Sequence, residues 1–201
     1  MLVLHYTGME SAEAAIDRLC DPQAKVSAHY VIHEDGRTVQ LVAEERRAWH
    51  AGVAFWRGNT DINARSIGIE MVNPGHEFGL KPFPEKQMAA LDTLVLEIVQ
   101  RHLIPGRNVV GHSDVAPRRK DDPGELFDWP RLYKCGIGVW PEEGQGGDMD
   151  EQQAGILLRD FGYETDDLGK TLEAFQRHFR PAEVNGDLDP ETAQLLNGLQ
   201  Q

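Results

Sequence analysis

The stretch AHYVIHEDGRTVQLV, residues 28–42, gives the clearest indication of the fold. Two runs rich in β-branched and aromatic residues flank Glu-Asp-Gly, an arrangement typical of a β-hairpin. Further strands are expected at residues 65–73, RSIGIEMVN, and at residues 2–6, LVLHY. Because strands alternate with stretches of helical periodicity, the sequence predicts an α/β domain with a mixed central β-sheet flanked by helices.

Helices are expected between and after these strands. Residues 11–21 and 84–104 show apolar residues at helical spacing, and a proline opens the longer stretch. Residues 107–117 predict a strand that runs into a loop, and residues 127–136 predict a short helix.

The composition argues against a membrane-spanning protein and against nucleic acid as a partner. The chain has 201 residues, 40% of them hydrophobic and 26% charged, and no apolar run long enough to span a bilayer. Its 33 acidic and 20 basic residues give a net charge of −13, which disfavours nucleic acid as a partner because such binding requires a basic surface. Cys20 and Cys135 are too few for a disulfide framework.

The composition changes in the last third of the chain. Residues 138–150 are rich in glycine and acidic residues without periodicity, and we interpret them as a linker. Residues 151–201 contain three short helical stretches, the last opened by Asp189 and Pro190. The predicted organisation is a domain at residues 1–137, a linker, and a small all-α domain whose size suits binding better than chemistry.

Two histidines and a carboxylate form a candidate metal site. His5 lies on the apolar first strand, where an unpaired imidazole is costly to bury. His112 lies where a strand gives way to a loop, and Asp122 follows ten residues later in KDDPG. Two histidines and a carboxylate are a set that binds catalytic zinc and leaves one coordination position open for water. Taken singly, each residue also has a structural interpretation, as a core histidine or a turn residue.

Glu70 and Lys120 are the candidate catalytic residues. Alternate residues of a strand share a face, so Glu70 shares its face with Gly68, and open space is expected beside it. A carboxylate there could take a proton from water at the metal. Lys120 would bring positive charge to a developing oxyanion. The alternatives are a solvated carboxylate at a strand end and a lysine within a charged surface loop.

Five motifs together resemble those of the zinc-dependent N-acetylmuramoyl-L-alanine amidases of the amidase-2 type, which are related to peptidoglycan recognition proteins. They are VLHYT (3–7), AHYVIHEDG (28–36), AWHAG (48–52), SIGIEMVN (66–73) and VVGHSDVAPRRKDDPG (109–124). The resemblance covers residues 1–135. It implies hydrolysis of the amide that joins the lactyl group of N-acetylmuramic acid to L-alanine of the peptidoglycan stem peptide.

The resemblance also implies a set of site residues. His5, His112 and Asp122 would hold one zinc ion per chain, Glu70 would be the general base, and Lys120 would stabilise the oxyanion. The combination of Asp122 as the third ligand with Ala28 just before the His-Tyr of the hairpin resembles the bacterial recycling and cell-wall branch of the family.

Further residues of these motifs have expected roles near the site. Trp49, His50 and Asn63 are candidate substrate contacts, with packing of its loop as the alternative for His50. His29 is expected to be structural, and Asp121 is expected to face solvent.

The end of the chain resembles the peptidoglycan-binding domain type 1, through AFQRHF (174–179) and VNGDLDPETAQLL (184–196). The segment RPAEV (180–184) departs from that pattern. The expected partner is therefore peptidoglycan or a soluble muropeptide, and the sequence leaves the oligomeric state open.

Two alternatives concern location and activity. The chain begins directly in a strand, so we expect the cell envelope or periplasm if a leader has been removed, and the cytoplasm otherwise. A non-catalytic protein that recognises peptidoglycan is the alternative to an enzyme. A metallopeptidase of another type has less support, because no H-E-x-x-H sequence is present.

Overall fold

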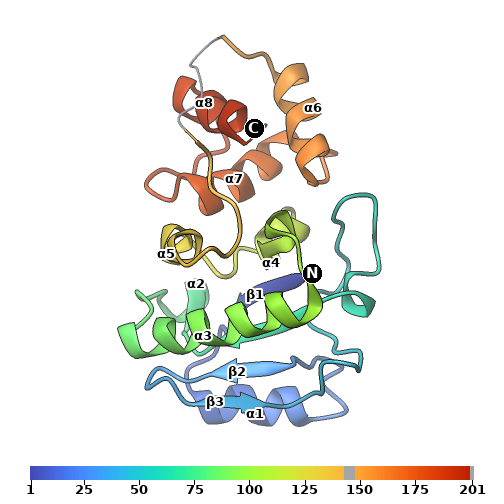
Figure 1. Ribbon diagram of the computed structural model, residues 1–201, viewed down its shortest axis with the longest axis vertical. Coiled ribbons are helices and arrows are strands. Elements are labelled where there is room, and N and C mark those ends of the chain that lie inside the picture. The colour runs from blue at the N-terminus through green and yellow to red at the C-terminus, as the bar shows by residue number, and fades with distance from the viewer. Residues whose placement is uncertain (143–147, 200–201) are drawn as a thin grey trace.

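A five-stranded β-sheet forms the centre of the larger part of the protein, seen in a computed structural model that describes residues 1–142 and 148–199 (Figure 1). The middle of the predicted linker, residues 143–147, lies outside the described residues. The strand order is β3-β2-β4-β1-β5. The strands are β1 (Leu2–Tyr6), β2 (Tyr30–Ile32), β3 (Thr38–Gln40), β4 (Ile67–Met71) and β5 (Val109–Gly111).

The sheet is mixed, as predicted. Strands β2, β4, β1 and β5 run parallel to one another, and β3 pairs antiparallel with β2 to form the predicted hairpin. Each hairpin strand is only three residues long, shorter than the β-rich runs in the sequence. Strand β1 pairs with neighbours on both sides, and His5 lies opposite Glu70 in its register with β4.

Helices cover both faces of this sheet. The long helix α3 (Glu85–His102) begins after Pro84 and packs its apolar face against alternate residues of β1 and β4, including Leu4 and Ile69. Helix α1 (Ala12–Cys20), capped by Ser11, packs on the sheet near Val31. Since successive strand residues face opposite sides, the side chain of His5 lies on the face away from α3. The remaining short elements are α2 (Gly75–Phe78), α4 (His112–Val115), α5 (Trp129–Lys134) and the 3-10 turns η1 (Ile62–Ala64) and η2 (Gly106–Asn108).

The segment after β5 differs from the prediction. His112 begins a single helical turn, α4, where a loop was expected. The turn forms because a carboxylate oxygen of Asp114 accepts the backbone N–H of Gly111 at 2.7 Å, which satisfies a donor that a helix start otherwise leaves unpaired.

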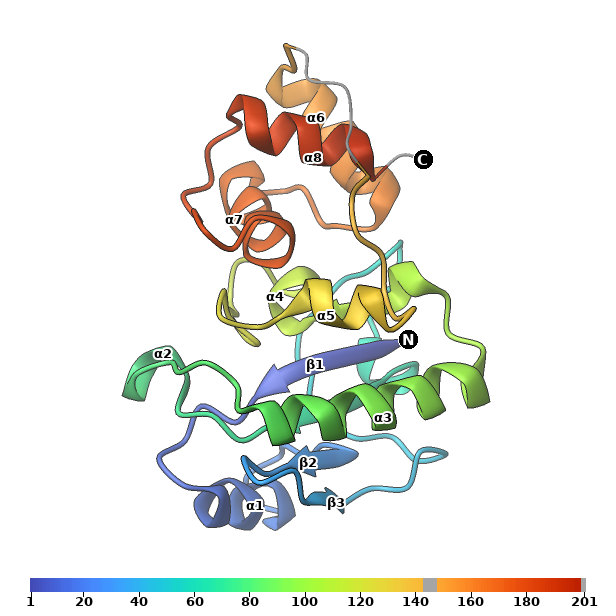
Figure 2. The same ribbon diagram turned by 60° about the vertical axis from the view of Figure 1, so that its left-hand side comes forward.

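Three helices follow the linker, as predicted: α6 (Glu151–Phe161), α7 (Leu168–Phe179) and α8 (Pro190–Gly198). Each begins after an aspartate whose side chain accepts a backbone N–H of the first turn, which includes the predicted cap at Asp189. Figure 2 shows them stacked above α4 and α5. No helix within residues 1–142 and 148–199 has the length and apolar character needed to cross a bilayer.

The three helices share their buried side chains with the sheet, so a separate all-α domain is not confirmed. A single apolar cluster contains Val3 and Trp56 together with Leu158 and Phe175. The close approach depends on Gly162, whose φ is 150° and whose missing Cβ would lie 2.9 Å from Cε2 of Trp56. The domain boundaries drawn from the sequence stay a prediction.

Candidate metal centre and active site

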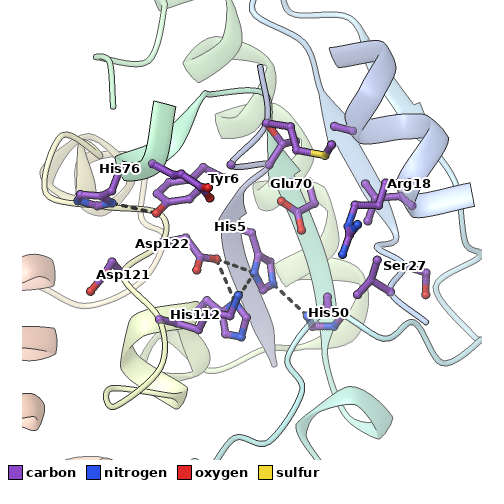
Figure 3. Close-up of a pocket in the computed structure, with 18 of the residues that line it drawn as sticks. His5, Tyr6, Arg18, Ser27, His50, Glu70, His76, His112, Asp121 and Asp122 are labelled. Atoms are coloured by element: carbon purple, nitrogen blue, oxygen red, sulfur yellow. Dashed lines mark hydrogen bonds and ion pairs between the residues drawn. The ribbon is translucent and has the colours of Figure 1, made fainter. Parts of the chain in front are cut away.

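The structure brings the three predicted metal ligands together. Nδ1 of His5 lies 3.0 Å from Nδ1 of His112 and 2.9 Å from Oδ2 of Asp122, and the two latter atoms are 3.0 Å apart (Figure 3). All three side chains are buried. Ligand atoms of a tetrahedral zinc ion are about 3.3 Å apart, as follows from metal–ligand distances of about 2.0–2.1 Å. The triangle is therefore close to the size that such an ion requires.

Local backbone geometry sets this arrangement. His5 lies on β1, and His112 follows directly after β5, the neighbour of β1. The backbone N–H of Ser113 donates to the carbonyl oxygen of Asp122 at 2.9 Å, which ties the third ligand to the second. Gly111 is required at this point, because a Cβ there would lie 2.7 Å from Cδ of Pro123.

A chain of hydrogen bonds fixes the tautomer of His5. The hydroxyl of Ser66 donates to the carbonyl of Ile62 at 2.6 Å, so its oxygen accepts from Nε2 of His50 at 3.2 Å. Nδ1 of His50 then accepts from Nε2 of His5 at 3.0 Å. The proton of His5 is thus on Nε2, and Nδ1 presents a free lone pair to the triangle.

The second histidine is oriented in the same way. Nε2 of His112 donates to the carbonyl oxygen of Ala51 at 3.0 Å, which leaves Nδ1 as the acceptor. Burial and the neighbouring His112 lower the pKa of His5 to about 4. Burial alone would raise the pKa of Asp122, but the two histidines hold it well below its ordinary range. Near neutral pH the cluster therefore offers an unprotonated His5 nitrogen and a carboxylate, which are donors that fit a divalent cation.

Glu70 is next to this cluster and has an unusual environment. Its Oε2 atom is buried without a hydrogen-bond partner among the described residues. Burial and the charge of Asp122 raise the pKa of Glu70 well above its ordinary value. The open space expected beside Gly68 is absent, because the ring of His50 occupies it: a Cβ on Gly68 would lie 2.4 Å from Cγ of His50.

A pocket of about 370 Å³ opens over the cluster. Glu70 and Lys120 both line it, and the ammonium group of Lys120 has no ion-pair or hydrogen-bond partner in the described part of the chain. Trp49 lines the same pocket and is 50% exposed. These positions are compatible with the roles expected for the three residues, which stay predictions.

The other expected contacts have structural partners. His50 is buried and bonded to His5, as described above. Asn63 accepts the backbone N–H groups of His50 and Ala51 at 3.0 and 2.8 Å, and it lines a neighbouring groove. His29 accepts from the backbone N–H of Gly68 and donates to a carbonyl, both at 3.0 Å, which agrees with a structural role.

Other pocket residues were not found by the sequence analysis. The hydroxyl of Tyr6 donates to His76 at 2.9 Å, and His76 in turn donates to Glu125 at 2.9 Å, forming one wall. Arg18 extends from α1 on the opposite side, near Glu70 (Figure 3). Arg18 lies on the exposed face of a helix pattern, so nothing in the sequence indicated its position.

A buried His-His-Asp cluster lies at the edge of the mixed β-sheet, beside a glutamate whose Oε2 atom has no hydrogen-bond partner in the described part of the chain, and this arrangement is typical of a metal-dependent hydrolase. Residues 1–125 match the family described as N-acetylmuramoyl-L-alanine amidase. The chain belongs to this family and is an enzyme of this activity. The predicted membership of the amidase family is thereby confirmed, whereas its zinc dependence stays a prediction, and a purely non-catalytic recognition protein is not supported.

Similar proteins cover almost the whole chain. N-acetylmuramoyl-L-alanine amidase AmiD of Escherichia coli (strain K12) is 38% identical over 99% of this chain and 81% of its own length. The structure of E. coli AmiD in complex with the substrate anhydro-N-acetylmuramic acid-L-Ala-D-γ-Glu-L-Lys has a TM-score of 0.90 and 36% identity, covering 99% of this chain and 87% of that one. The structure of AMPDH3 from Pseudomonas aeruginosa has a TM-score of 0.92 and 37% identity, covering 100% and 90%.

Proposed function

We propose that the protein hydrolyses the lactyl–L-alanine amide of muropeptides with one zinc ion held by His5, His112 and Asp122. The observation that supports this proposal is the triangle of donor atoms, 2.9 to 3.0 Å on each side, with hydrogen bonds that leave both Nδ1 atoms unprotonated. Two histidines and a carboxylate match the donor types of catalytic zinc sites. When bound, zinc polarises a carbonyl and makes water more acidic.

Glu70 is the proposed proton carrier. Water must lose a proton to attack, and the amine of L-alanine must gain one to leave, so a single group can serve both steps. The Oε2 atom of Glu70 has no hydrogen-bond partner in residues 1–142 and 148–199, and Glu70 lies opposite His5 in the strand pairing, which supports this role. A raised pKa suits a group that must accept a proton and then release it.

Lys120 is the proposed oxyanion partner. Its ammonium group lies on the pocket wall without a partner in the described chain, so it is available to a developing negative charge. Loss of one well-placed donor of this kind costs about 3 kcal/mol of transition-state stabilisation.

The proposed substrate is a muropeptide that carries its stem peptide. Solved complexes of E. coli AmiD and P. aeruginosa AMPDH3 hold anhydromuramic acid with a tripeptide and a pentapeptide respectively. Trp49 presents half of its side chain at the pocket edge and is the proposed surface for the sugar. Arg18 and Lys120 add positive charge that suits the carboxylates of a stem peptide, despite the net charge of −13.

Intact peptidoglycan and soluble anhydromuropeptide are the two candidate forms of the substrate, and the cell envelope and the cytoplasm are the two candidate locations. Comparing release of stem peptide from purified sacculi and from soluble anhydromuropeptide distinguishes the two substrates. Glycan binding by residues 151–201 stays a prediction.

Zinc content and peptide release test the mechanism together. Glu70→Gln should keep one zinc ion per chain and lose at least about 100-fold in kcat, because proton transfer by a positioned side chain contributes about 10²- to 10⁴-fold. Asp122→Asn should lose zinc. Asp160→Asn, on the exposed side of α6, is the matched control and should change neither quantity.

Two outcomes would contradict the assignments. Full activity of Glu70→Gln with zinc bound would remove Glu70 from its role. Undiminished zinc content of Asp122→Asn would show that Asp122 is not a ligand.

A further inference from the structure

Helix α7 contacts the metal-ligand segment, residues 112–122, at two places. Nδ1 of His178 donates to Oδ2 of Asp114 at 2.7 Å, and Asp114 lies two residues after the ligand His112. Nη2 of Arg177 lies 3.0 Å from Oδ1 of Asp121, the residue before the ligand Asp122. Both contacts therefore reach a neighbour of a metal ligand from a helix more than fifty residues further along the chain.

Asp114 depends on the C-terminal helices for its partners. The residue is completely buried, and a buried carboxylate is costly unless its oxygens are paired. Oδ1 accepts the hydroxyl of Tyr163 at 2.7 Å, and Oδ2 accepts His178 and the backbone N–H of Gly111, both at 2.7 Å. The two side-chain donors, Tyr163 and His178, both follow the predicted linker in the sequence. The carboxylate of Asp114 that they hold in turn fixes the helical turn that begins at His112.

The two α7 residues are themselves held in place. The ring of His178 is stacked between those of Trp129 and Phe179, at centroid distances of 3.7 and 4.0 Å. Arg177 is only 8% exposed, which is unusual for an arginine. The side chain of Asp121 is 54% exposed but pairs with Arg177, so the expectation that Asp121 simply faces solvent was incomplete.

The three proposed ligands lie on secondary-structure elements of different rigidity. His5 lies on a strand paired on both sides, whereas His112 lies on a single helical turn and Asp122 lies in a loop. Ligands on such short elements take their precision from surrounding contacts, and loss of supporting contacts commonly lowers metal affinity about 10- to 100-fold.

We propose that helix α7 is a positioning element of the metal centre, in which Arg177 and His178, together with Tyr163, hold residues 112–122 in the geometry that binds the ion. The C-terminal helices then contribute to metal affinity and turnover, whether or not they also bind glycan. This inference rests on the proposed zinc-dependent function.

Two buried arginines on the same helix end provide a matched test. Arg177 reaches the metal-ligand segment, whereas Arg180 pairs with Glu183, Asp189 and Glu191, all within the C-terminal helices. The full-length Arg177→Gln and Arg180→Gln variants are compared by thermal unfolding, by zinc affinity in competition with a chromogenic chelator, and by kcat and KM for anhydromuropeptide.

Both variants should lose thermal stability, but only Arg177→Gln should lose zinc affinity, by about 10-fold or more. Its kcat should fall by a larger factor than its KM rises, because Arg177 itself does not line the pocket and reaches it only through its partner Asp121. Arg177→Lys should restore part of the affinity. Tyr163→Phe keeps the buried ring but removes a hydrogen-bond donor to Asp114, so it should also weaken zinc binding. This second variant tests the proposal if Arg177→Gln does not fold.

Several results would overturn the inference. Zinc affinity unchanged in both Arg177→Gln and Tyr163→Phe would refute positioning by α7, as would an equal loss in Arg180→Gln. A raised KM with intact zinc affinity would make Arg177 a substrate contact instead. If the unmodified protein binds no zinc and releases no peptide, the proposed function itself fails, which distinguishes the two failures.

Discussion

Replacing Gly68 with alanine is expected to weaken the metal site without altering any ligand. The added Cβ would lie 2.4 Å from Cγ of His50 and 2.6 Å from its Nδ1. Gly68 lies in β4, where alanine needs no special backbone conformation, so the clash with the ring is the main effect of the substitution.

The size of the effect follows from the distances. An ordinary contact between such atoms is about 3.5 Å, so the ring must move by about 1 Å. That movement lengthens or bends the hydrogen bonds of the ring to His5, now 3.0 Å, and to Ser66, now 3.2 Å and already near the limit for this bond type. His5 then loses the contact that sets its tautomer and ring angle.

We expect zinc affinity to fall about 10-fold, the lower end of the range for a lost supporting bond. Overpacking should also cost about 1–3 kcal/mol of unfolding free energy. Zinc affinity is measured by chelator competition on the folded protein, and stability by urea denaturation.

Gly155→Ala is the matched control, because the Cβ position of Gly155 in α6 has no neighbour within 4 Å. It should leave zinc affinity unchanged and add up to about 1 kcal/mol of stability, since alanine favours the helix. In a His50→Ala background, Gly68→Ala should have little further effect on zinc binding. Affinity of folded Gly68→Ala within two-fold of the unmodified protein would refute the orienting role of His50.

Two further predictions concern stability. In the metal-free Glu70→Gln variant, the free energy of unfolding should fall by at least about 3 kcal/mol as the pH is lowered from 6.5 toward 4, because the unfolded chain protonates His5 while the folded chain keeps the pKa of His5 at about 4. Burial also lowers the pKa of His50 and of His29, which adds to the loss in the same direction. The Glu70→Gln variant is used because the raised pKa of Glu70 makes the free energy of unfolding change with pH in the opposite direction above the ordinary glutamate pKa. Urea denaturation at several pH values measures the free energy of unfolding. Gly162→Ala should lower stability by about 1–3 kcal/mol, measured by calorimetry, because its φ of 150° and the nearby ring of Trp56 leave no room for a methyl group; an unchanged melting temperature would contradict this.

Local patterns were sufficient to predict most elements of the fold. Residues 84–104 carry one apolar stripe after a proline, and α3 occupies most of this range. The metal cluster was predicted through motifs and not through spacing, since His5 and Asp122 are 117 residues apart and no periodicity connects them. Only the order of several motifs along the chain indicated that they meet.

Long-range side-chain contacts could not be predicted in this way. The helical pattern of residues 168–179 shows an apolar face but does not identify the surface that this face covers. Arg177 and His178 are charged or polar in the sequence, and their burial is understandable only with Asp121 and Asp114 beside them. The filling of the space at Gly68 by His50 likewise depends on a loop conformation that the sequence does not specify.

The position of His5 on a doubly paired strand has a consequence for how long the protein retains a bound ion. Residues 2–4 of β1 pair with both β4 and β5, and His5 pairs with Glu70 of β4, so the backbone amides of β1 should exchange with solvent hydrogen only through large-scale unfolding. Residues 112–122 form one helical turn and a loop, so we expect them to open by a smaller, sub-global fluctuation that would remove two of the proposed ligands at once. If the proposed ion is bound, its dissociation rate should follow the local stability of this segment more closely than the melting temperature of the whole protein.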